Sequence, residues 1–98
     1  MLNLDVTTAG PTATITVVGE IDLSSSAELA TSLDEARATG AEQVELDFAG
    51  VTFLDSFGLR TLIEAHTQAP IIIVGTPPNI RRIFDIVGLS EVLGLDPA

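Results

Sequence analysis

Two segments of this chain alternate between apolar and polar side chains, and this alternation constrains the fold more than any other feature. In residues 12–17, alanine, isoleucine and valine alternate with threonine; in residues 44–48, valine, leucine and phenylalanine alternate with Glu45 and Asp47. Such alternation is typical of strands with one buried and one solvated face. A sheet with helices on both faces needs strands that are apolar on both sides. We therefore expect helices mainly on one face.

Two further strands complete the predicted sheet. Residues 2–7 alternate in the same way, and Gly10 and Pro11 mark a turn into the next strand, which predicts an antiparallel hairpin. Residues 71–74 are a β-branched run that is typical of a buried parallel strand. The sequence thus predicts an α/β fold with a mixed four-stranded sheet in a single domain, residues 1–98.

Helical segments separate these strands. The first helix is predicted to begin at Ser25, because Glu28 three residues later completes a capping box, and to end before Gly40. The second is predicted over residues 59–66, after a turn that carries Asp55, Ser56 and Gly58. Short links between alternating strands and helices predict right-handed crossovers that place successive helices on the same side of the sheet.

The third predicted helix follows the last strand. Thr76 is expected to cap it, with Pro77 at the first helical position, where the missing N–H has no intrahelical partner to lose. Its apolar stripe consists of Ile80, Ile83, Phe84 and Val87, and Gly88 ends it. Residues 90–95 are predicted to form one more helical turn.

Composition excludes several classes of function. The chain has 14 acidic residues, four arginines and no lysine, for a net charge of −10. We expect no nucleic-acid ligand, because phosphate backbones are bound by basic surfaces. Cysteine is absent, which excludes disulfide and thiolate chemistry, and no metal site is predicted. No apolar run approaches the roughly 20 residues that span a bilayer. We expect a cytoplasmic protein.

Two aspartates stand immediately after predicted strands. Asp22 and Asp55 would meet at the same end of the sheet if these strands are parallel neighbours, and α/β folds bind ligands at that end. The start of the second helix also favours a carboxylate or phosphate there. Both aspartates can instead cap helices or fix turns. The residues alone leave both interpretations open.

Catalysis is not predicted. Asp55, Ser56 and His66 have the side chains of a catalytic triad, but ten helical residues place His66 about 15 Å from Ser56, beyond hydrogen-bond reach. No glycine-rich phosphate-binding spacing occurs. We therefore expect a protein that is not an enzyme and has no cofactor. The neighbouring Arg81 and Arg82 are expected on the solvated surface of their helix, with a specific anion contact as the alternative.

Three segments of the chain, taken together, resemble a known family. They are residues 19–23 (GEIDL), residues 46–59 (LDFAGVTFLDSFGL) and residues 80–89 (IRRIFDIVGL). In this order and spacing they resemble the STAS domain family, and within it the stand-alone anti-anti-sigma factors, or anti-sigma factor antagonists. The resemblance implies a small α/β domain with helices on one face of a mixed sheet. It also implies a protein partner, an anti-sigma factor that is a serine kinase.

The resemblance implies a switch by phosphorylation, and this sequence lacks the residue that usually accepts the phosphate. Family members usually read DSSG or DSTG, and the second hydroxyl residue receives the phosphate that releases the partner. Phe57 occupies that position here, and Ser56 matches the preceding serine, the one substitute acceptor. Phe57 is expected either to anchor the partner or to fold back onto the core. The partner surface that the resemblance implies comprises Asp22, Ser24, Asp55, Ser56, Phe57, Gly58 and Arg60.

Two alternatives remain beside an antagonist that sequesters an anti-sigma factor. The domain can be a non-switching STAS module of a scaffold or of a membrane lipid- or anion-transport complex. It can also retain a phosphoacceptor at Ser56 and act as a switch. No direct membrane insertion is expected, and weak self-association is compatible with either function.

Overall fold

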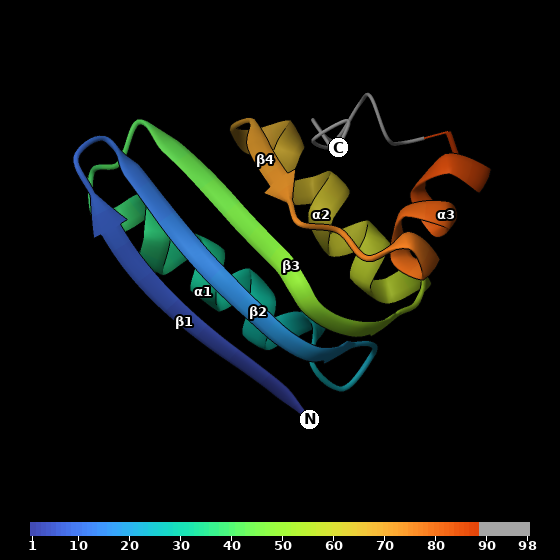
Figure 1. Cartoon of the computed structure of the whole chain (residues 1–98). Coiled ribbons are helices and arrows are strands. Elements are labelled where there is room, and N and C mark those ends of the chain that lie inside the picture. The colour runs from blue at the N-terminus through green and yellow to red at the C-terminus, as the bar shows by residue number, and fades with distance from the viewer. Residues whose placement is uncertain (89–98) are drawn as a thin grey trace.

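The computed structural model describes residues 1–88, and its elements follow the predicted order. They are β1 (Leu2–Ala9), β2 (Thr12–Ile21), α1 (Ser26–Ala38), β3 (Gln43–Leu54), α2 (Ser56–Gln68), β4 (Ile71–Val74) and α3 (Pro78–Ile86). The strands form one sheet in the order β1-β2-β3-β4 (Figure 1). β1 pairs with β2 antiparallel, and the other two pairs are parallel. The predicted mixed four-stranded sheet is confirmed.

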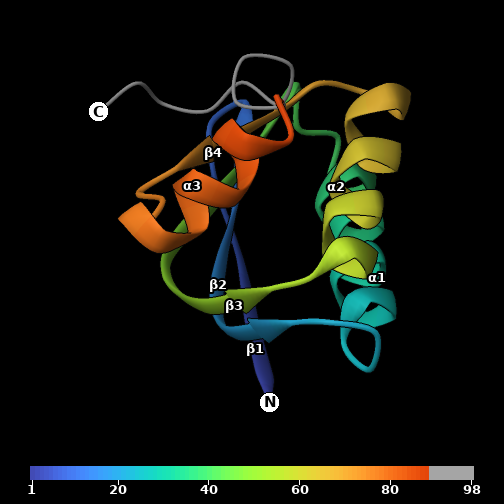
Figure 2. The ribbon, with the colours of Figure 1, turned by 90° about the vertical axis from the view of Figure 1, so that its right-hand side faces the viewer.

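Two helices cover one face of the sheet, as the alternation predicted. Figure 2 shows α1 and α2 on the same side of the strands. The side chains that face them are buried, whereas the polar side chains between are only half-buried. The buried set is Ala13, Ile15, Val17, Val44, Leu46 and Phe48; the half-buried set is Thr14, Thr16, Glu45 and Asp47.

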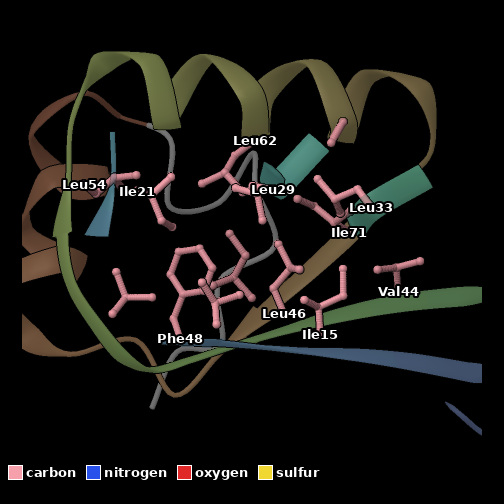
Figure 3. Close-up of a cluster of buried hydrophobic side chains, with 14 of the residues drawn as sticks. Ile15, Ile21, Leu29, Leu33, Val44, Leu46, Phe48, Leu54, Leu62 and Ile71 are labelled. Atoms are coloured by element: carbon pink, nitrogen blue, oxygen red, sulfur yellow. The ribbon is translucent and has the colours of Figure 1, made fainter. Parts of the chain in front are cut away.

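The core lies between the sheet and these helices. Ile15 and Leu46 of the central strands point toward Leu29 and Leu33 of α1 and Leu62 of α2 (Figure 3). All five side chains are almost fully buried. Burying each contributes roughly 1.5–3 kcal/mol relative to leaving it exposed. The core therefore holds α1 and α2 against one face of the sheet.

Arg37 of α1 joins the two helices at the far end of α2. Its Nη2 donates to the carbonyl oxygens of Ala65 and Ala69, both at 2.7 Å, and its Nη1 donates to Gln68 Oε1 at 3.2 Å. The last carbonyls of a helix have no intrahelical partner and carry partial negative charge. The Ala65 carbonyl oxygen also accepts from Ala69 N–H, so Arg37 adds a second hydrogen bond there, supplies one to Ala69, and holds the C-terminal end of α2 against α1.

α3 packs beyond β4. β4 pairs only with the first part of β3, from Val44 to Asp47. The Phe84 ring of α3 lies against Phe48 of β3, with ring centroids 6.5 Å apart. Val87 was predicted on the same apolar stripe, but the helix ends at Ile86 and Val87 is exposed. The predicted turn over residues 90–95 lies outside the described residues.

The predicted N-cap position of α1 is confirmed, but the capping box predicted there is not formed. Ser25 is the N-cap residue of α1, but its side chain makes no capping bond. Its buried hydroxyl instead donates to the Glu20 carbonyl oxygen at 2.8 Å and accepts from Asp22 N–H at 3.0 Å. The side chain turns inward because the loop after β2 has backbone groups to satisfy.

The start of α3 is also shifted, by one residue. Pro77 is its N-cap, with an extended ψ of 151°, and Pro78 is the first helical residue. A residue before proline is driven out of the helical region, so the proline pair itself sets this start. The predicted cap, Thr76, has a buried hydroxyl oxygen without a hydrogen-bond partner in the described part of the chain.

The strand and helix that flank the candidate site are both longer than predicted. β3 continues from the predicted end at Phe48 to Leu54, and α2 begins at Ser56 instead of Leu59. The pairing of β3 with β2 shifts register twice, between Thr16 and Val18 and between Gly19 and Glu20. Each shift interrupts the alternation of apolar and polar side chains along the strand. The sequence of the second half of β3 therefore does not predict a strand. Asp55 alone separates β3 from α2.

Candidate functional site

The carboxyl ends of β2 and β3 meet at one edge of the molecule. Ile21 and Leu54, the last residues of these strands, are paired, and Asp55 N–H donates to the Ile21 carbonyl oxygen at 3.1 Å. The next residues along the chain are Asp22 and Asp55. The prediction that the two aspartates lie at the same end of the sheet is confirmed.

Asp55 is the N-cap of α2. Its Oδ1 accepts from Phe57 N–H at 2.9 Å and from Gly58 N–H at 3.0 Å. Aspartate is among the best N-caps, because its carboxylate satisfies amide groups that have no carbonyl partner in the first turn. Asp55 therefore fixes the direction in which Ser56 and Phe57 leave the sheet.

Gly58 lets the first turn of α2 rest on the strand ends. A Cβ atom at this position would lie 2.6 Å from Leu54 Cδ1, 2.7 Å from Ile21 Cγ2 and 3.0 Å from the Ile21 carbonyl oxygen. No other amino acid fits without displacing these atoms. Gly58 is itself buried, so it shapes the surface predicted for this site without being exposed on it.

The loop after β2 is organised around the Asp22 carboxylate. Its Oδ1 accepts from Ser24 N–H at 3.0 Å and from the Ser24 hydroxyl at 2.7 Å, and it lies 3.2 Å from the Ser25 hydroxyl, which shares its proton with the Glu20 carbonyl oxygen. The hydrogen bond from the Ser24 hydroxyl, with smaller help from Ser25, holds the pKa of the Asp22 carboxyl below its usual value. Asp22 is therefore a fixed negative charge at neutral pH, while it also shapes the turn.

Large apolar side chains are exposed beside these acids. Phe57 is 46% exposed, so it does not fold back into the core. Leu23, next to Asp22, is 65% exposed, and Phe53, near the end of β3, is 48% exposed. Neither Leu23 nor Phe53 was predicted from the sequence as a site residue. An apolar residue directly after Asp22, in a polar loop, was the available signal for Leu23.

Comparison with known proteins identifies the family. The family model for the STAS domain matches residues 3–98. This chain belongs to the STAS domain family. An anti-sigma-B factor antagonist from Staphylococcus epidermidis is 29% identical over 97 residues, which cover 94% of this chain and 90% of the relative. Its counterpart in Staphylococcus aureus is 27% identical with the same coverage.

Solved structures show the same STAS fold. An anti-sigma factor antagonist from Mycobacterium paratuberculosis superposes with a TM-score of 0.89 at 24% identity, covering all of this chain and 87% of that one. The antagonist SpoIIAA in its unphosphorylated form gives a TM-score of 0.72 at 23% identity, with 100% and 88% coverage. SpoIIAA has also been solved in a phosphorylated form. At these identities the likeness concerns the fold alone.

The remaining predicted partner residues of this STAS domain lie on the surface. Ser24, Ser56 and Arg60 are exposed. Arg60 Nε lies 3.1 Å from Glu64 Oε1 one turn along α2, in an open ion pair. A pair of this kind contributes about 0.3–0.5 kcal/mol, so Arg60 can exchange Glu64 for another anion at little cost.

His66 has a structural role away from this site. It lies in the last turns of α2, and its Nδ1 accepts from Ile71 N–H, the first amide of β4, at 3.1 Å. Residues 1–88 contain no group of three histidine, cysteine or acidic side chains placed to hold a metal ion. Within the same range, no helix is long and apolar enough to cross a membrane.

Two substitutions of His66 test whether its hydrogen bond to the Ile71 amide stabilises the fold. His66→Ala should lower the free energy of unfolding by about 1–3 kcal/mol, because it leaves the Ile71 amide without an acceptor. His66→Asn should recover most of this loss, since the asparagine Oδ1 is attached to Cγ as the histidine Nδ1 is. Urea unfolding monitored by circular dichroism measures both. Equal destabilisation by the two substitutions would show that packing of the ring, and not the hydrogen bond, matters.

Proposed function

We propose that this STAS domain is an anti-sigma factor antagonist that binds an anti-sigma factor through the carboxyl ends of β2 and β3 and is not switched by phosphorylation at position 57. Binding would displace the sigma factor and allow transcription. The observation that carries the proposal is the exposed Phe57 at the second position of α2, held by the Asp55 cap. The curated relatives bear the name of anti-sigma-B factor antagonists, which supports the general function.

The unswitched state follows from the chemistry of this position. A phenylalanine has no hydroxyl to accept a phosphoryl group, whereas the fold relative SpoIIAA has been solved in a phosphorylated form. An exposed aromatic side chain is instead a common interface anchor, and truncation of such an anchor often costs 2 kcal/mol or more. The ionised Asp22 at the same end of the sheet supports a partner surface with positive charge.

Binding to purified anti-sigma factors from the source genome tests this proposal. We expect one of them to bind the chain in isothermal titration calorimetry, and we expect its kinase activity with ATP to leave the intact mass of the chain unchanged. Failure of every anti-sigma factor to bind would favour the non-switching module of a scaffold or transport complex. A stoichiometric phosphoryl group on Ser56 would show that the switch is retained at the neighbouring residue.

The acidic pair gives a second, independent test at the same interface. Asp22→Asn and Asp55→Asn each remove a charge but keep an oxygen that can accept the hydrogen bonds of the turn or cap. Each should weaken binding about fivefold to tenfold at low salt, mainly by slowing association. Glu42→Gln, at the opposite end of β3, is the matched control. If neither asparagine variant differs from this control, the aspartates do not belong to the interface.

A further inference from the structure

Exposed apolar side chains gather at the end of the sheet that carries Asp22 and Asp55. Eight large apolar residues are exposed in the described part of the chain, and five of them lie at this end. These five are Met1, Val18, Leu23, Phe53 and Phe57. Such a group on a highly charged chain is unlike the scattered apolar residues of an ordinary surface. An anchor role for Phe57 does not explain why the other four side chains are exposed here.

Part of this group faces away from α1 and α2. Phe53 is paired with Glu20, and both are exposed, whereas the next pair, Ile21 and Leu54, is buried under the helices. Side chains of successive residues point to opposite faces of a sheet. Phe53 therefore lies on the face opposite α1 and α2.

Val18 continues the surface along the same face. It is paired with Gly50, and a Cβ atom on Gly50 would lie 2.8 Å from Val18 Cγ2. The glycine thus leaves room for the valine side chain, which is 44% exposed. Leu23, Phe53, Phe57 and Val18, here called the apolar rim, run from the start of α2 around the strand ends to the opposite face. Since an aromatic side chain offers about 150–250 Å², the rim presents a few hundred Å².

Carboxylates neighbour the apolar rim. Glu20, Asp22 and Asp55 lie beside its members in the chain or in the strand pairing. Within residues 1–88, the amino group of Met1 pairs with one of them and lies 2.9 Å from Glu20 Oε1. The internal hydrogen bonds of Asp22 and Asp55 use Oδ1. The surface therefore combines exposed apolar side chains with neighbouring carboxylates.

We propose that the interface of this domain extends past Phe57 over the whole apolar rim, and that its occupant is a protein segment presenting arginine next to aliphatic side chains. A guanidinium pairs with carboxylates and stacks on phenylalanine faces, so it satisfies both components of this surface. A second copy of the chain, with the same charge of −10, is repelled, and anionic lipid is repelled for the same reason. This inference rests on the proposed function and names the chemistry of the partner and the extent of its contact.

Binding kinetics of surface variants test the extent of the interface. The probe is the anti-sigma factor that binds the unchanged chain, immobilised for biolayer interferometry. Phe53→Thr keeps a side chain suited to a strand and should raise the dissociation rate about tenfold or more, with the association rate within about twofold, because apolar anchors act mainly on dissociation. Leu23→Ser, in a loop, should act in the same direction and provides a second variant if Phe53→Thr lowers the melting temperature.

Ile63→Thr is the matched control, because Ile63 is an exposed apolar residue of α2 outside the apolar rim. If the unchanged chain binds but Phe53→Thr and Leu23→Ser behave like Ile63→Thr, the extended interface is wrong and the proposed function stands. If no anti-sigma factor binds the unchanged chain, the proposed function fails first. Sedimentation equilibrium of the chain alone completes the test: a dimer that Phe53→Thr dissociates would assign the rim to a second copy and overturn the proposal.

The salt dependence of the association rate tests whether the occupant presents arginine. Raising sodium chloride from low to high concentration should slow association with the unchanged chain, since screening weakens pairs between exposed charges. The slope should become shallower for Asp22→Asn. An association rate that is independent of salt for both proteins would exclude a basic occupant.

Discussion

Gly58→Val should lower the melting temperature by roughly 10–20 °C. Even a Cβ atom at this position overlaps Leu54 Cδ1 and Ile21 Cγ2, at 2.6 and 2.7 Å, and valine adds two more carbons. Overpacking a tight site typically costs 1–3 kcal/mol, and 1 kcal/mol corresponds to about 4–8 °C in a domain of this size. Thermal unfolding followed by circular dichroism measures the shift.

The same substitution should reduce partner binding at temperatures where the variant is still folded. The Ile21 carbonyl oxygen, 3.0 Å from the added carbon, accepts the hydrogen bond of the Asp55 amide. Moving α2 away from it displaces the cap and Phe57 together. Ser56→Ala, at the exposed first position of the same helix, is the control and should leave the melting temperature within about 2 °C, as surface changes usually do. A Gly58→Val melting temperature near that of the unchanged chain would mean that the helix start is not held against the strands.

The sheet was predictable because one physical signal dominates it. Alternation in β2 and at the start of β3 reflects a face packed on α1 and α2 and a face without them, so burial alone sets the pattern. The second half of β3 was missed because two register shifts insert residues that interrupt this period. Phe53 lies in that half. The error in the strand therefore hid one of the exposed aromatic residues of the site.

The location of the two aspartates was predictable from the sequence, but the role of their carboxylates was not. Their positions after two strands placed Asp22 and Asp55 at one end of the sheet, and the pairing of Ile21 with Leu54 confirms it. From the sequence, each aspartate could have either a structural role or a binding role. The structure shows the structural role, with Oδ1 of each side chain engaged in a turn or cap. Because each role needs different atoms of one carboxylate, the two roles are compatible.

The serine before α1 shows where local patterns mislead. Ser25 and Glu28 have the spacing of a capping box, but Ser25 is buried, and its hydroxyl binds the loop between β2 and α1. A spacing rule cannot report which backbone groups a loop leaves unsatisfied. The same hydrogen bonds orient the residues from Asp22 to Ser24, so the missed interaction contributes directly to the shape of the site.

If the proposed function holds, the substitution Phe57→Ser should convert a domain without a switch at position 57 into one that is switched. With the partner kinase and ATP, the variant should gain one phosphoryl group on residue 57, and the modified form should bind the partner at least about 100-fold more weakly. A phosphoserine adds about −1.5 to −2 charges at neutral pH. Here it would stand one residue from Ser56 and two from Asp55, at an end of the sheet that already carries Glu20 and Asp22. Intact-mass spectrometry and calorimetry of the separated forms give the two readouts.

Two further variants separate the loss of the aromatic ring from the gain of the phosphate. Phe57→Ala should weaken binding by about 2 kcal/mol, as an anchor truncation does, and should stay unmodified. Phe57→Ser combined with Ser56→Ala should still be phosphorylated, which assigns the acceptor to residue 57. A phosphorylated Phe57→Ser that binds as well as its unmodified form would refute the electrostatic mechanism. Stoichiometric phosphorylation of the unchanged chain on Ser56 would refute the unswitched state itself, because phenylalanine at position 57 would then not have removed the switch.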